Sequence, residues 1–205
     1  MTPGDYCMSS ETTLPVPSSH PTGWRLPAAH VLRRASGYLE LGELLVDGES
    51  PPPATACRLL ERALDELGQL TADERQAGNA SLVAGEALRA LGRWQAALEP
   101  LSRAAEGRGH REAWLGIGWC QKRLGRLDLA IAALRKGLAA FPNEALLLYN
   151  LACYHSLAGD VPAAVEHLTR AIAIDARFRD LTGAEHDFDA IREDPRFVAV
   201  TTVIV

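Results

Sequence analysis

Small and large apolar residues follow one helical pattern that occurs three times between Gly78 and Ala176. Gly85, Gly118 and Ala152 are separated by 33 and then 34 residues, and four more columns recur at the same intervals. These columns are Gly92, Gly125 and Gly159; Ala97, Ala130 and Ala164; Leu101, Leu134 and Leu168; and Ala104, Gly137 and Ala171. A period of about 34 residues with two helical patterns per copy predicts a solenoid of helical hairpins.

Each copy is expected to hold two helices joined by a glycine turn. Thr71 and Glu74 form a predicted capping box, in which each side chain bonds the other residue's backbone amide at a helix start. From there the apolar spacing predicts one helix to about Leu91. Further helices are expected at 94–106, 112–124, 127–140, 144–158 and 161–175. The glycines at the turns, where a left-handed cap favours this residue, are Gly92, Gly125 and Gly159.

A divergent repeat is predicted before these three. Apolar positions have helical spacing over residues 28–46 and again over 56–67. Three prolines, 51–53, separate the two patterns and end the first helix, because proline lacks a backbone donor and disfavours helical geometry in the residue before it. The matches to the recurring columns are Gly42, Ala56, Leu60 and Ala63.

These columns resemble the tetratricopeptide repeat family, which places small residues at the eighth, twentieth and twenty-seventh positions and a large apolar residue at the twenty-fourth. The chain departs from the family at the eleventh position, usually Tyr, and the final Pro survives only as Pro142. The resemblance implies an all-α fold, a right-handed α-α superhelix of about four repeats with a C-terminal cap. The expected boundaries are a disordered arm at 1–26 and a solenoid at 27–205, with repeats at 28–70, 73–110, 111–144 and 145–176 and a cap at 177–205.

The segment 184–197 looks like the terminal segment of many bacterial tetratricopeptide proteins, in which short helices close the last repeat. We expect Phe188, Ile191 and Phe197 to cover the otherwise exposed apolar face of that repeat. The β-branched tail 198–205 has strand propensity, whereas the resemblance favours helix for its first half, and we adopt the helix.

Charge and composition argue against several classes of protein. The net charge of −5 and pI near 5.7 argue against a general nucleic-acid binder. No membrane span is expected, because no run of 18 apolar residues exists, and the N-terminus lacks the features of a secretory signal. A cytoplasmic location is therefore expected. The cysteines are interpreted as structural thiols in a reducing compartment, and they are Cys7, Cys57, Cys120 and Cys153.

The resemblance implies that first-helix positions opposite the packing face line a concave groove. At its centre we expect a diagonal of large side chains, formed by Leu82, Leu115, Trp119 and Tyr149. A basic edge is expected from Arg89, Lys122 and Arg123, and the same face carries Glu86, Asn150 and Cys153. Aromatic anchors with a polar rim are typical of a peptide-binding surface.

The sequence thus predicts a non-catalytic adaptor, scaffold or chaperone-like module that binds a peptide or helix of another protein. Two alternatives stay open at this point: the chain's own arm or N-terminal helix covers the groove, or a second subunit does so in a homodimer. Clamping of a C-terminal carboxylate is disfavoured, because only Asn150 fits the Lys and Asn positions that such family members use. No cofactor, metal or catalytic residue is expected, since no His-Glu-x-x-His motif or converging triad is visible.

Overall fold

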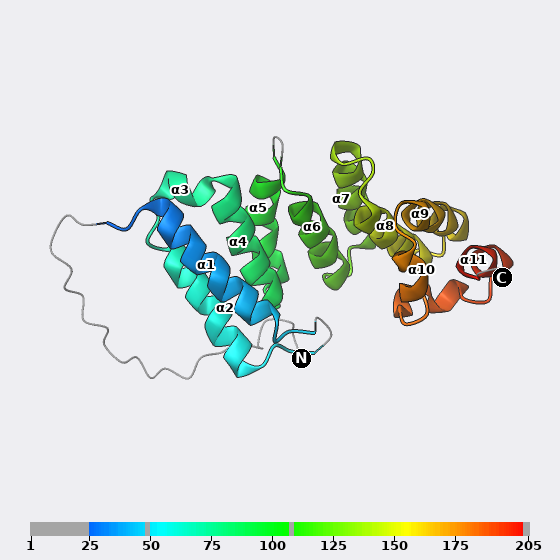
Figure 1. Ribbon diagram of the computed structural model, residues 1–205, viewed down its shortest axis with the longest axis horizontal. Helices are drawn as coiled ribbons and strands as arrows, with labels where there is room; N and C mark the ends of the chain where they lie inside the picture. Colours follow the sequence, from blue (N-terminus) through cyan, green and yellow to red (C-terminus); the bar gives the residue numbers. More distant parts are fainter. Residues whose placement is uncertain (1–24, 48–49, 107–108, 203–205) are drawn as a thin grey trace. The chain divides into compact units, whose positions relative to one another are not determined.

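The computed structural model describes residues 25–47, 50–106 and 109–202, and these residues form helices and turns with no strand. They belong to two compact units, the first within residues 1–113 and the second within 114–205. Each unit is built from consecutive helices that lie side by side (Figure 1). The predicted all-α class is therefore confirmed. The predicted disordered arm lies outside the described residues except for Arg25 and Leu26.

The first unit contains two helical hairpins. Its helices are α1 (Ala28–Glu43), α2 (Ala54–Leu67), α3 (Ala72–Gln76), α4 (Gly78–Ala90) and α5 (Trp94–Ala105). α1 packs along α2, and α4 packs along α5. The core between α1, α2 and α4 is made of aliphatic side chains, among them Val31, Leu39, Leu60, Leu67 and Val83.

The small-residue columns permit close helix packing. A Cβ added to Gly85 would lie 2.5 Å from Leu101 Cγ, and one added to Gly42 would lie 2.7 Å from Leu60 Cγ. In the second unit, a Cβ on Gly118 would lie 2.8 Å from Leu134 Cδ2. Each glycine thus lets the leucine of the following helix approach its backbone. The contact at Gly42 and Leu60 shows the same packing in the sequence-divergent hairpin.

The turn glycines adopt the left-handed conformation that the sequence predicts. The φ angles of Gly92, Gly125 and Gly159 are 74°, 73° and 75°. At the first of these turns, Arg93 N donates to Leu88 O at 2.9 Å and Gly92 N donates to Arg89 O at 3.0 Å. This pair of bonds is the Schellman motif, which satisfies carbonyls that the helix end would leave unpaired. Residues with side chains would be strained at these φ values.

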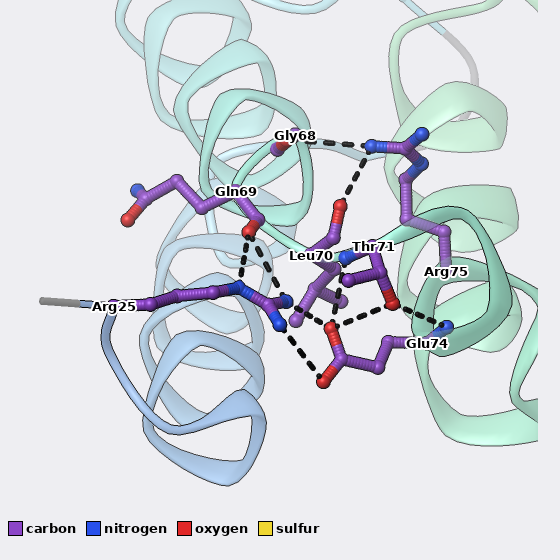
Figure 2. A network of polar contacts seen from close by, with 7 residues as sticks. All are labelled: Arg25, Gly68, Gln69, Leu70, Thr71, Glu74 and Arg75. Atoms are coloured by element: carbon purple, nitrogen blue, oxygen red, sulfur yellow. Dashed lines mark hydrogen bonds and ion pairs between the residues drawn. The ribbon is translucent and has the colours of Figure 1, made fainter. Parts of the chain in front are cut away.

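The capping box at Thr71 and Glu74 forms as predicted, but the helix that it starts is short. Thr71 N donates to Glu74 Oε2 at 2.8 Å, and Glu74 N donates to Thr71 Oγ1 at 3.3 Å (Figure 2). The expected continuous helix to Leu91 is wrong, because Ala77 is extended, with ψ 143°, and separates α3 from α4. The Arg75 side chain donates back to Leu70 O at 2.8 Å, and the Ser81 hydroxyl donates to Arg75 O at 3.2 Å. These side-chain bonds stabilise the turn in place of helical backbone bonds.

The second unit contains the last helices and the cap. They are α6 (Arg111–Arg123, whose first turn belongs to the first unit), α7 (Leu127–Ala140), α8 (Ala145–Leu157), α9 (Val161–Ile174), α10 (Arg177–Leu181), the 3₁₀ helix η1 (His186–Ile191) and α11 (Pro195–Thr201). α8 is the central helix, since it packs on α7, α9 and η1. Its residues from Leu147 to Ser156 are therefore buried, apart from the half-buried Asn150.

The predicted cap residues reach the core of this unit. Phe188, Ile191 and Phe197 have exposed fractions of 0%, 3% and 2%. The helix α11 extends through Thr201, so the helical interpretation of the tail is confirmed as far as the structure describes it. Residues 203–205 lie outside that part.

The cysteines differ in state. Cys120 and Cys153 are buried free thiols, as predicted. Cys57 is disulfide-bonded, so the prediction that it is a structural thiol is wrong. A search of the described helices for a segment long and apolar enough to cross a membrane found none.

Candidate functional site

Lys122 lies at the centre of a cluster that joins α6, α8 and η1. Its ammonium is 5.7 Å from the centroid of the Trp119 ring and 5.5 Å from that of Tyr154, so it contacts two aromatic rings. The same ammonium forms an ion pair with the Asp187 carboxylate of η1. The positive charge predicted to face a partner is therefore compensated by the chain itself.

Tyr149 and Cys153 are covered by the C-terminal cap. Their exposed fractions are 6% and 2%. The Tyr149 ring packs against Phe178 at 4.9 Å between centroids and against the edge of Phe188 at 5.7 Å. This burial does not fit the prediction that the two residues line an open groove, since cap side chains pack on Tyr149.

Burial also determines the protonation of these two groups. It raises the pKa of the Cys153 thiol, and the nearby charges of Glu185 and Asp187 raise it further. Burial raises the pKa of the Tyr149 hydroxyl in the same way. Both groups are therefore neutral at physiological pH, and Cys153 lacks the thiolate character of a reactive cysteine.

Five of the predicted residues in this unit keep part of their surface open, and one of them is Lys122. Leu115 and Trp119 on α6 are half-buried, and Arg123 at the end of that helix is exposed. Asn150 on α8 is half-buried, and its side-chain amide donates to Leu146 O at 2.9 Å. Leu115 and Trp119 are the partly exposed apolar residues of α6 that the sequence assigned to the groove, and we call this pair the α6 surface; Trp114 on the same helix is also half-buried.

The other predicted residues belong to α4 in the first unit. Leu82 is half-buried there. Arg89 donates to Glu86 Oε2 at 2.6 Å and to Glu43 Oε1 of α1 at 2.7 Å. Burial raises the pKa of Glu43, and the Arg89 charge opposes that rise. The predicted basic edge is thus partly neutralised in this unit too, by carboxylates from α1 and α4.

A polar network that sequence reasoning missed extends the capping box to Arg25. The Arg25 guanidinium forms an ion pair with Glu74 and contacts Gln69 O at 3.4 Å (Figure 2). The Arg25 hydrogen bond and the Thr71 amide bond lower the pKa of Glu74 to about 2. Beside this network lies a cavity of about 330 Å³ lined chiefly by small and aliphatic residues, including Ala28, Leu32, Leu70 and Ala80. The Thr71–Glu74 spacing signals the cap, but nothing in the local sequence signals its distant arginine.

A histidine pair is the second feature that the sequence did not reveal. The rings of His155 on α8 and His167 on α9 have centroids 5.3 Å apart. An Arg135 nitrogen from α7 lies 3.3 Å from His155 Nε2, and the Asp160 carboxylate lies 3.4 Å from His155 Nδ1. Burial lowers the pKa of both histidines, and the Arg135 charge lowers that of His155 further. Across the described residues, no group of three or more His, Cys, Asp or Glu could hold a metal ion.

Family models match part of this chain. Two family models, both described as tetratricopeptide repeat, match residues 58–110 and 88–152. No curated protein matches the chain. Among solved structures, "Crystal structure of PcrH in complex with the chaperone binding region of PopB" is similar at 20% identity, with a TM-score of 0.44, over 64% of this chain and 94% of that chain. The family matches and the recurring packing columns together identify residues 58–152 as tetratricopeptide repeats.

Proposed function

We propose that the chain is a non-catalytic protein-interaction module that binds a peptide or helix of another protein on the α6 surface. The observation that carries this proposal is the partial exposure of Leu115 and the Trp119 ring on α6, at first-helix positions that the sequence assigned to the groove. The family supports the general function of binding proteins. The α6 surface supplies the large apolar side chains that dominate binding energy at protein interfaces.

Binding would be driven mainly by apolar contact. Lys122 is paired with Asp187, and Arg89 is paired with Glu43 and Glu86, so these cations have carboxylates before any partner arrives. A partner's acidic residue would have to compete with those pairs. We therefore expect affinity to depend weakly on salt, because few new ion pairs form on association.

A truncation of Trp119 tests the proposal. Trp119→Ala removes the partly exposed ring of the α6 surface, and we expect proteins retained by the immobilised wild-type chain to be lost. Leu129→Ala is the matched control, since Leu129 is exposed on α7 outside the proposed surface. Candidate segments identified in this way would then be titrated against purified protein, where a loss of at least tenfold in affinity is expected for Trp119→Ala, consistent with removal of an interface anchor.

The same variants separate this function from self-association. Sedimentation of the wild-type chain over a range of concentrations should give the monomer mass of 22.1 kDa. A dimer that forms with increasing concentration, and that Trp119→Ala abolishes, would assign the α6 surface to a homodimer instead. Equal retention of partners by all three proteins would exclude the α6 surface as the binding site.

A further inference from the structure

Two adjacent residues of the cap contact residues that the sequence predicts to bind a partner. Asp187 forms the ion pair with Lys122, and Phe188 packs against Tyr149. We call Lys122, Tyr149 and Cys153 the cap site, because all three lie beside this acidic and aromatic pair. One short segment of the chain therefore satisfies the charge and the apolar surface of the site together.

Within the cap, η1 is the short element that packs on α8. η1 has six residues and is a 3₁₀ helix, a form with poorer hydrogen-bond geometry than the α-helix. Several of its polar contacts stay within the cap: Arg192 donates to Thr182 O and Glu185 O, both at 3.0 Å, and to Asp189 at 2.7 Å. These bonds would persist if the segment left α8 as a unit.

Attachment of η1 to the rest of the unit rests on side chains. Phe188 and Ile191 are both buried in the core, and Phe188 also packs on Phe197 of α11 at 5.2 Å between centroids. Asp187 supplies the charge that pairs with Lys122 of α6. An aromatic anchor combined with one ion pair is the kind of recognition by which a peptide binds a protein surface.

We propose that the cap site binds segments in which an acidic residue directly precedes an aromatic residue, that Asp187 and Phe188 occupy it within the chain, and that a partner segment of this chemistry exchanges with them. This inference rests on the proposed function, since it gives the same unit a second surface for protein partners. Asp187 and Phe188 of the cap would then compete with the partner segment for the cap site, besides covering the end of the last repeat. The high effective concentration of a tethered segment keeps the site closed until such a partner is abundant.

Rescue in trans tests the recognition. The full-length Phe188→Ala variant lacks the ring that fills the cap site. A synthetic peptide of residues 184–194, which contains Phe188, is then added to supply that ring. We expect the peptide to bind this variant at least tenfold more tightly than the wild type, because the tethered competitor is weakened. It should also slow hydrogen exchange in α8. A peptide with the Asp187→Asn and Phe188→Ala changes is the control and should do neither.

A folded Phe188→Ala chain that gains neither affinity nor protection from the peptide would overturn the inference. If this variant fails to fold by circular dichroism, Phe188→Leu takes its place with the same peptides and the same expected and contrary results. If Trp119→Ala loses partner binding but the peptide does not rescue Phe188→Ala, the proposed function is supported and only the inference about the cap site is rejected.

Exchange of the cap is tested separately in the wild-type fold. We expect Asp187→Asn and Lys122→Met each to raise amide exchange in η1 and α11 roughly fivefold, with little change in α9, since each removes one partly buried ion pair. The double variant should match the single variants, because both remove the same interaction. Cap amides that exchange only together with α8 and α9 in every variant would show that the cap does not open on its own.

Discussion

Gly85 illustrates how a single residue sets the distance between two helices. A Cβ at this position would lie 2.5 Å from Leu101 Cγ and 3.1 Å from Leu101 N, and Leu101 is fully buried. Since neither the backbone nor the packed side chain has room to move, we expect Gly85→Ala to lower the free energy of unfolding by about 1–3 kcal/mol, as overpacking does elsewhere. Urea unfolding followed by circular dichroism measures the change.

The control for this prediction is Gly37→Ala in α1, where an added Cβ has no atom within 4 Å. Alanine there should stabilise the chain by up to about 1 kcal/mol through helix propensity alone. A Gly85→Ala chain that is as stable as Gly37→Ala would show that α5 can shift to accept the methyl group.

The histidine pair predicts a loss of stability in mild acid. The pKa values of His155 and His167 are lowered in the folded chain, so the unfolded state binds more protons as pH falls through the unfolded value of about 6.5. Stability is complete above that pH and declines below it, by at most about 1.4 kcal/mol per pH unit for each histidine. The Asp160 and Glu166 carboxylates favour the protonated form, whereas Arg135 opposes it.

Urea unfolding at pH 7.5 and pH 5.5 measures this effect. In His155→Gln with His167→Gln the difference between the two pH values should shrink, because the titrating groups are absent. His186→Gln is the control for the substitution itself, since His186 is exposed and lies outside the histidine pair. An equal pH dependence in all three proteins would assign the acid sensitivity to carboxylates.

At the scale of elements, a buried carboxylate joins α1 to α2. Glu66 is fully buried and accepts from Arg34 of α1 at 2.7 Å and from Gln69 at 2.8 Å, and Arg62 lies at 3.2 Å. We expect Glu66→Gln to lower the free energy of unfolding by about 2–3 kcal/mol, because it removes the charge-assisted bonds and leaves donors poorly paired.

Glu61→Gln on the same helix is the matched control. Glu61 pairs with Arg93 at 2.7 Å, but both side chains are about one third exposed or more. Exposed pairs contribute little, so a loss below about 1 kcal/mol is expected. Equal losses at both positions would mean that burial adds nothing to the Glu66 pair.

Helix α3 shows which features of a helix a local sequence pattern can predict. The Thr71–Glu74 spacing predicts the start of α3, because a capping box involves only neighbouring residues. It does not predict the end of that helix at Gln76. The break depends on Arg75 folding back onto carbonyls of the preceding turn, and propensity does not register such side-chain bonds.

At the scale of the molecule, the division into two compact units predicts that local unfolding in one unit is largely independent of the other. Repeat proteins are stabilised by contacts between neighbours, so a local change need not reach every repeat. We expect Gly85→Ala to speed amide exchange in α4 and α5 several-fold more than in α8 and α9. Mass-spectrometric exchange on the intact chain measures this, and an equal acceleration in both units would show a single cooperative fold.

Periodicity made the helical hairpins predictable from the sequence alone. Small residues at fixed intervals permit close helix packing, and glycine at the turns permits positive φ, so residue type determines both features directly. The cap residues Phe188, Ile191 and Phe197 were predictable for a related reason, since the last repeat of a solenoid must be covered.

Only the tertiary structure decided which candidate residues remain open. Tyr149, Cys153 and Lys122 have the residue types and helix positions of a binding surface, yet η1 covers the first two and pairs with the third. Helical periodicity predicts which face of a helix a side chain lies on. It does not predict which segment, distant in the sequence, packs against that face, because no local pattern encodes that contact. The sequence by itself therefore determined the repeat fold, whereas long-range packing determined that Tyr149 and Cys153 are buried and that Lys122 is paired within the chain.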